Sequence, residues 1–193
     1  MFNNNLKGKN IILASGSPRR QQFFVDLNLD FEIRLKEIEE VYPEELVAEE
    51  IPNFLARLKA DAFCEDLTNN DLLITSDTIV WLKNKALGKP KDFEDAFAIL
   101  RELSGNMHEV ITSVCFMTKA SVEVISETTK VYFNELTDKE ISYYVTNFKP
   151  YDKAGAYGIQ DWIGLIAVTK IEGSYANVMG LPVDKVYNYL KNI

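Results

Sequence analysis

Two arginines end a short polar turn near the start of the chain, in the segment SGSPRR at residues 15–20. Hydroxyl and guanidinium groups at one turn are suited to bind phosphate oxygens, because a guanidinium can donate two parallel hydrogen bonds to a phosphate. Ser17 is a good N-cap and Pro18 suits the first helical position, so the turn is expected to open a helix whose unpaired N–H groups also attract anions. The alternative is an N-capped surface helix with solvated arginines. The residues that would bind the anion are Ser15, Ser17, Arg19 and Arg20.

A carboxylate interrupts an apolar, strand-like segment, since Asp77 lies within residues 72–80. Burying a carboxylate is costly unless it meets a cation, a hydrogen-bond donor or a metal. Asp77 is therefore a candidate base or metal ligand at the floor of a cleft, and the alternative is a turn residue at the end of a strand. Lys89 follows one hairpin later in the sequence and could point back to the same floor.

Two further charged positions carry little information by themselves. Glu40 is the second residue of an acidic pair, and such charge clusters usually cover a solvated face. Lys59 lies at the edge of the apolar stripe of a helix expected from Pro52 onwards, where a lysine commonly extends its stem along apolar surface. From the residue types, the ordinary surface interpretation is favoured at both positions.

A glycine-rich segment, YDKAGAYGIQ at residues 151–160, is expected to be a loop. Its glycines permit positive φ angles and a close approach of the backbone to a ligand. Tyr157 offers a stacking surface, and the Gln160 amide could form hydrogen bonds with the edge of a nucleobase. The single histidine of the chain, His108, excludes a site with several histidine ligands.

Apolar periodicity predicts the elements that position these residues. A buried strand at residues 11–14 precedes the first turn, and the helix after it packs through Phe23, Phe24 and Leu27. Further strands are expected at 31–35, 72–81, 110–118, 122–133 and 165–171, with helices from 52, over 93–103, from 137 to about 144 and from 182. Because hairpins at 83–85 and 119–121 interrupt the alternation of strands and helices, the expected class is α/β with a mixed sheet.

Composition narrows the class of protein. The 193 residues are 47% hydrophobic, which is enough for one sizeable core, and the net charge of −8 argues against non-specific nucleic-acid binding. No apolar run reaches the roughly 20 residues of a transmembrane helix, and the first residues lack the apolar core of a secretory signal. Cys64 and Cys115 have no metal-ligand spacing, and both are expected to be core thiols in a reducing cytoplasm. A cytoplasmic protein that binds neither membrane nor nucleic acid is expected.

Several motifs together resemble the Maf family of nucleoside triphosphate pyrophosphatases. The resemblance begins with the strand and SGSPRR, and most of its remaining motifs are LARLKA at 55–60, DT at 77–78, GKP at 88–90, SGNMHEVIT at 104–112, DKAGAYGIQ at 152–160 and GSYANVMGLP at 173–182. The matched motifs run from residue 12 to residue 182. DKAGAYGIQ resembles the branch that acts on dTTP and UTP. One departure is Asp161, followed by Trp162, where the family commonly has a glycine after the glutamine, and this could reshape one rim of the pocket.

The resemblance implies a fold and an activity. The expected fold is a single elongated, Maf-like (ITPase-like) domain over residues 1–193, with a mixed twisted sheet flanked by helices and a cleft between two lobes. The expected reaction is hydrolysis between the α- and β-phosphates of a nucleoside triphosphate, dependent on Mg²⁺ or Mn²⁺. A homodimer acting on a small-molecule nucleotide is implied as well.

The resemblance also implies roles for single residues. Asp77 would be the proton acceptor that activates water, Glu40 with Asp77 would bind the metal, and Lys59 and Lys89 would act at the triphosphate together with Ser15, Ser17 and Arg19. The positions that would distinguish the base are Arg20, Thr78 and Gln160. His108 is expected to be structural or to support the site indirectly, because histidine is not the family's base.

Two alternatives remain open at this point. The same chemistry could act on a modified purine nucleotide, which would change only the residues that contact the base. The chain could instead be a nucleotide-binding regulator of cell division with little turnover. Asp77, Glu40 and the two lysines argue against a pure sensor, because a sensor needs no water-activating base.

Overall fold

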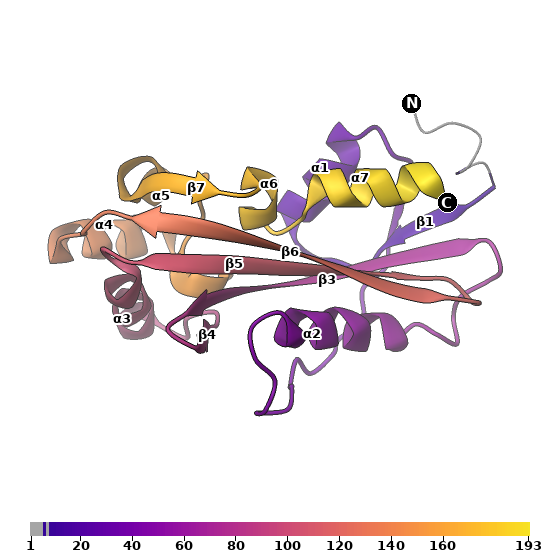
Figure 1. Ribbon diagram of the computed structural model, residues 1–193, viewed down its shortest axis with the longest axis horizontal. Coiled ribbons are helices and arrows are strands. Elements are labelled where there is room, and N and C mark those ends of the chain that lie inside the picture. Colours follow the sequence, from indigo (N-terminus) through magenta and orange to yellow (C-terminus); the bar gives the residue numbers. More distant parts are fainter. Residues whose placement is uncertain (1–5, 7) are drawn as a thin grey trace. The chain divides into compact units, whose positions relative to one another are not determined.

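The structure is a computed structural model that describes residues 6 and 8–193 (Figure 1). The strands are β1 (Asn10–Leu13), β2 (Glu32–Ile33), β3 (Asp71–Leu82), β4 (Lys85–Leu87), β5 (Met107–Met117), β6 (Val122–Phe133) and β7 (Val168–Glu172). The helices are α1 (Pro18–Asp26), α2 (Glu50–Asp61), α3 (Phe93–Leu103), α4 (Asp138–Phe148), α5 (Trp162–Ala167), α6 (Tyr175–Val178) and α7 (Val183–Asn192), with a 3₁₀ turn η2 (Ala154–Ala156). Within the described residues, no helix is long and apolar enough to cross a membrane.

The strands of the described residues form one mixed sheet. Six of these strands lie side by side in the order β2-β1-β3-β5-β6-β7. The seventh, β4, pairs with β3 and is not part of this order. β1 lies parallel to both β2 and β3, with Ile12 opposite Leu73 in the second pair. β4 runs antiparallel to β3 and β7 antiparallel to β6. The α/β class and the mixed sheet expected from the sequence are therefore confirmed.

The chain divides into two compact units. The first contains residues up to Asp77, then 112–127 and 180–193, and the second contains 78–111 and 128–179. β3, β5 and β6 each contribute residues to both units, and the division of β3 falls between Asp77 and Thr78. The expectation of a single domain over residues 1–193 stays a prediction.

In the first unit, helices cover both faces of the strands, with α1 and α7 on one face and α2 on the other (Figure 1). Successive side chains of a strand point to opposite faces of the sheet, and two neighbouring residues of β1 show this. Leu13 shares a core cluster with Phe24 of α1, whereas Ile12 shares one with Ala56 of α2. The strand after which the first turn begins is thus fixed by apolar packing on both sides.

The two cysteines differ in burial. Cys115 is a core thiol as expected, because it belongs to the cluster that contains Ile12 and Ala56. Cys64 is exposed, so the expectation of a core thiol at that position is wrong.

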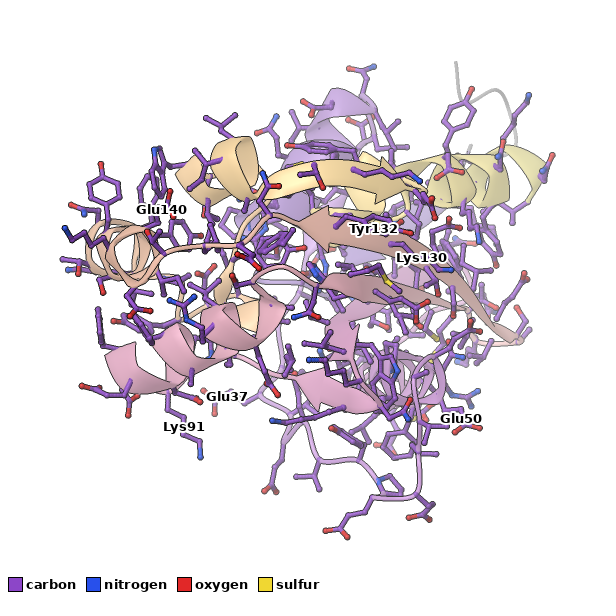
Figure 2. All side chains as sticks on the ribbon, turned by 60° about the vertical axis from the view of Figure 1, so that its left-hand side comes forward. Glu37, Glu50, Lys91, Lys130, Tyr132 and Glu140 are labelled. Atoms are coloured by element: carbon purple, nitrogen blue, oxygen red, sulfur yellow. The ribbon has the colours of Figure 1, made fainter. Side chains whose placement is uncertain are left out.

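The second unit has its own core. Leu100 of α3, Tyr144 of α4 and Tyr157 of the glycine-rich loop belong to one buried cluster. α4 begins with the expected capping box, in which the Glu140 carboxylate accepts the Thr137 N–H at 2.7 Å and Thr137 Oγ1 accepts the Glu140 N–H at 3.3 Å. Figure 2 labels Glu140 at this helix. α4 extends to Phe148, four residues beyond the expected end.

Three segments differ from the sequence-based expectations. Residues 165–167 belong to α5 rather than to a strand, and β7 begins only at Val168. α2 begins at Glu50, so that Pro52 lies in its first turn, where its missing N–H costs nothing. The strand expected at 31–35 is reduced to two residues, β2. A short apolar run such as WIGLIA is compatible with helix or strand, because periodicity does not separate the two over so few residues.

Candidate functional site

The turn before α1 has the geometry of a capped helix start. Ser17 is the N-cap, its Oγ accepts the Arg20 N–H at 3.5 Å, and Pro18 is the first helical residue. Ser15 is buried, and its Oγ accepts the Ser17 N–H at 3.3 Å. Each serine oxygen already accepts a hydrogen bond from a backbone N–H. The O–H of each serine could therefore donate a hydrogen bond to a phosphate oxygen.

Arg20 is held in place by backbone carbonyls. Its Nε donates to the Gly180 carbonyl at 2.8 Å and its Nη1 to the Ser76 carbonyl at 3.0 Å. Burial lowers the pKa of Arg20 from its ordinary value, and the Asp77 carboxylate opposes this shift. Carbonyls of the main chain cannot swing away as side chains do. Arg20 is therefore a fixed cation on the Asp77 side of the turn, and both Arg19 and Arg20 are half-buried.

A lysine joins two of the predicted acidic residues. Lys59 Nζ donates to Asp77 Oδ1 at 2.6 Å and lies 3.0 Å from Glu40 Oε1. The Asp77 side chain is 9% exposed and that of Lys59 15%, while the Glu40 side chain is 44% exposed. The cluster therefore has a buried carboxylate paired with a nearly buried ammonium, and a second carboxylate at its solvent side. We refer to Glu40, Lys59 and Asp77 as the charged cluster.

The alternation of β3 explains why Asp77 meets Lys59. Thr75 Oγ1 donates to the Ala56 carbonyl of α2 at 2.6 Å, so Thr75 points to the α2 face. Asp77, two residues later, points to the same face, and Lys59 lies one helical turn beyond Ala56. β3 continues to Leu82, so the alternative interpretation of Asp77 as a turn residue at a strand end is wrong. Ser76, which lies between Thr75 and Asp77, is buried, and its Oγ has no hydrogen-bond partner among the described residues.

The remaining predicted site residues belong to the second unit. Thr78 follows Asp77 in β3 and is half-buried, while Lys89 and Gln160 are exposed in loops. The loop that carries Lys89 is tied to the glycine-rich loop, because the Gly88 carbonyl accepts the Gly155 N–H at 3.0 Å. Gly155 adopts a positive φ of +69°, as expected for a glycine of this loop. A Cβ at this position would lie 2.7 Å from Val80 Cγ2.

His108 is buried behind this loop. Its Nε2 lies 2.7 Å from the Tyr157 hydroxyl, and its ring packs edge-on against the rings of Phe133 and Tyr157. Burial lowers the pKa of His108 to about 3, so the ring is neutral near pH 7. The structural interpretation of His108 agrees with this position. Tyr157, expected as a stacking surface, is buried and directs its hydroxyl to the histidine instead.

Sequence reasoning missed how some of these residues are held. Seven predicted residues lie in the first unit (Ser15, Ser17, Arg19, Arg20, Glu40, Lys59 and Asp77) and three in the second (Thr78, Lys89 and Gln160). Nothing in the residue spacing indicates that Lys59 pairs with both carboxylates or that the Gly180 carbonyl holds Arg20. The polar triplet TSD at 75–77 within an apolar strand was the available signal for Thr75 and Ser76.

The charged cluster has donors that suit a hard cation. Mg²⁺ is commonly bound by one or two carboxylates, with waters and substrate phosphates as its other ligands. Glu40 and Asp77 supply two carboxylates at one ammonium group. Among the residues that the structure describes, no group of three or more His, Cys, Asp or Glu side chains gathers as a metal centre. The two carboxylates of the charged cluster match the one or two that a cation shared with phosphate takes from protein.

Comparisons with known proteins identify the family. Residues 10–193 match the family described as Maf-like protein. A Flavobacterium johnsoniae relative named dTTP/UTP pyrophosphatase is 63% identical over 193 residues, covering 100% of both chains. A Flavobacterium psychrophilum relative of the same name is 61% identical over 192 residues, covering 100% of this chain and 98% of the relative. The solved structure of the Staphylococcus aureus Ham1 protein is a more distant match, with a TM-score of 0.46 at 20% identity over 66% of this chain and 73% of that chain. The family match and the two relatives show that this chain belongs to the Maf family.

Proposed function

We propose that this chain is a nucleoside triphosphate pyrophosphatase that hydrolyses dTTP and UTP to the monophosphate and pyrophosphate. The observation that carries the proposal is the charged cluster of Glu40, Lys59 and Asp77 in the same unit as the turn before α1. A buried carboxylate paired with an ammonium group can act on a water beside bound phosphates. The relatives that match the full length of the chain at more than 60% identity carry the name dTTP/UTP pyrophosphatase.

Asp77 is proposed as the residue that orients the attacking water and accepts its proton. Lys59 engages its Oδ1, so Oδ2 is the oxygen that would face the water. A general base must lie within hydrogen-bond reach of the proton that it takes. The Lys59 ammonium would offset the charge of the carboxylate before the reaction and lose part of that interaction as the proton arrives.

The triphosphate is proposed to bind along the turn and the lysines. An ammonium group has three donors, of which Lys59 directs two at Asp77 and Glu40, so the third would reach a phosphate oxygen. Ser15, Ser17 and Arg19 would contact phosphate through hydroxyl and guanidinium donors, and Lys89 would add a further cation. Donors of this kind stabilise charge on a departing pyrophosphate.

Glu40 and Asp77 would hold Mg²⁺ or Mn²⁺, which when bound neutralises phosphate charge. Arg20, Thr78 and Gln160 are proposed to select the base. We further propose that the protein works as a homodimer in the cytoplasm. Its substrates are proposed to be free nucleotides rather than nucleic acid, since a net charge of −8 disfavours binding to nucleic acid.

Pyrophosphate release from a panel of nucleotides tests this proposal. With Mg²⁺ or Mn²⁺, we expect turnover of dTTP and UTP above that of dCTP, dATP, dGTP and ITP, and loss of turnover with EDTA. Turnover restricted to purine nucleotides would contradict the pyrimidine assignment. Tight nucleotide binding without pyrophosphate release from any member of the panel would favour a regulator instead.

A further inference from the structure

Gln160 lies in a tight turn of the second unit. The Asp161 N–H donates to the Gly158 carbonyl at 3.0 Å, so residues 158–161 form a four-residue turn in which Gln160 is third. Ile159 is buried, whereas Gln160 is exposed. The turn thus directs the side chain of Ile159 into the core and leaves that of Gln160 exposed to solvent.

One buried hydroxyl connects both ends of this turn. Tyr144 Oη donates to Asp161 Oδ2 at 2.7 Å and accepts the Gly158 N–H at 3.1 Å. Tyr144 is fully buried on α4, and its ring stacks on Phe148 with centroids 5.1 Å apart. Burial, helped by Asp161, raises the pKa of Tyr144 above its usual range, so the hydroxyl remains a donor at working pH. The orientation of the Asp161 carboxylate is therefore set by the core of this unit.

Two glycines keep the turn compact. A Cβ on Gly164 of α5 would lie 1.8 Å from the Ile159 carbonyl oxygen, so α5 packs directly on the backbone of the turn. A Cβ on Gly158 would lie 2.6 Å from Asp161 Oδ2 and 2.8 Å from Gln160 Nε2. The Gln160 amide nitrogen and the carboxylate oxygen held by Tyr144 therefore pack over the same backbone atom.

We infer that Asp161, held by Tyr144, determines which end of the Gln160 amide faces the nucleotide and thereby selects bases that carry a ring N–H. An ionised carboxylate only accepts hydrogen bonds, so it favours the amide NH₂ on its own side. The Gln160 Oε1 then faces the ligand as an acceptor. Uracil and thymine present a ring N3–H to such an acceptor, whereas the N3 of cytosine carries a lone pair that repels it.

This inference rests on the proposed role of Gln160 in base selection and adds two positioning residues to it. UTP and CTP form the sharpest substrate pair, because they share the ribose and the triphosphate and differ only at the base. Asp161→Asn preserves the shape of the side chain and can still accept from Tyr144, but it no longer repels the amide oxygen. Tyr144→Phe removes the hydroxyl that holds the carboxylate.

The experiment measures kcat/KM for UTP and for CTP in the wild-type chain and in both variants. We expect the wild type to favour UTP by tenfold or more, and the ratio to fall about tenfold in each variant, which is the order expected from losing one oriented hydrogen bond to a base edge. Tyr143→Phe is the matched control, because Tyr143 is exposed and packs through its ring on Trp162. Its ratio should equal that of the wild type. A merely structural role would lower both rates together and leave their ratio unchanged.

Equilibrium binding of UTP and CTP in EDTA gives a second readout that needs no turnover. An unchanged UTP-to-CTP ratio in Asp161→Asn, in rate and in affinity, overturns the inference, as does a wild type that does not distinguish the two nucleotides. If Tyr144→Phe does not fold, as judged by its thermal transition, Asp161→Asn decides. A wild type without turnover contradicts the proposed function, and the affinity ratios then decide this inference separately.

Discussion

The two units hold the predicted site residues by different physical means. In the first unit, the charged cluster is held by ion pairs, with Lys59 Nζ between Asp77 and Glu40. In the second unit, the turn that carries Gln160 is held by a neutral hydroxyl and by close backbone packing at Gly158 and Gly164.

This difference separates two requirements of the proposed enzyme. Acting on a triphosphate needs concentrated charge, which a buried ion pair supplies at the cost of desolvation. Distinguishing one base from another needs a donor or acceptor in a fixed direction, which a buried hydroxyl and a rigid turn supply. Substitutions in the first unit should therefore change rate and stability strongly, and those in the second should change selectivity and pH response.

Asp77→Asn should have the largest effect, because an amide cannot accept the proton of the attacking water. We expect kcat to fall about 10²–10⁴-fold, the usual worth of a positioned general base, with the affinity for dTTP retained. Single-turnover pyrophosphate release and equilibrium binding check the two parts. Asp71→Asn is the matched control, since Asp71 is also buried in β3 but bonds to Asn10 and Thr68. Hydrolysis by Asp77→Asn at the parental rate would refute the assignment of the base.

Lys59→Met should come next, because it leaves the Asp77 carboxylate buried without its ammonium partner. We expect the free energy of unfolding to fall by about 3 kcal/mol, as when one partner of a buried pair is removed. Urea unfolding at pH 7 measures it. Arg57→Met is the control on the same helix, because Arg57 and Asp61 form a pair in which both side chains are 49% exposed, and it should cost less than about 1 kcal/mol. Equal losses in the two variants would mean that the charged cluster behaves as a surface pair.

His108 should produce the smallest effect, seen in the dependence of stability on pH. Its pKa is about 3 in the folded chain and 6.5 at its ordinary value, so only the unfolded chain gains a proton as the pH falls from 6.5 towards 3. Stability contributed by the neutral ring is therefore present above pH 6.5 and lost below it, by about 2 kcal/mol between pH 7 and pH 5. The free energy of unfolding, measured by urea titration at several pH values in this range, should depend less steeply on pH in His108→Gln than in the wild type. Parallel slopes would mean that the histidine is accessible to protons in the folded state.

Local signals predicted much of the fold. The helix at 93–103 was predicted to the residue, and the capping box of Thr137 with Glu140 was found from two residue types at the right spacing. The hairpin turn was located by Lys83 and Asn84, which both adopt positive φ. α5 was missed because its short apolar run, WIGLIA, is compatible with a helix or a strand over so few residues.

The site was predicted less completely than the fold. Asp77 stood out because a carboxylate within an apolar strand demands a partner, but the identity of that partner as Lys59 required the register of α2 on β3. Tyr144 gave no signal, because an aromatic residue at helical spacing is ordinarily a core residue. Its hydroxyl becomes informative only when the loop that it holds is located in space.

The direction in which Asp77 points also limits how the length of this chain can change in evolution. A single residue inserted into or deleted from β3 before Asp77 would turn its carboxylate from the α2 face to the opposite one, because strand side chains alternate with a period of two. The connection between β2 and α2 has no such constraint over most of its length. Lineages of this protein should therefore vary in the lengths of their connections while β3 keeps the same number of residues between Thr75 and Asp77.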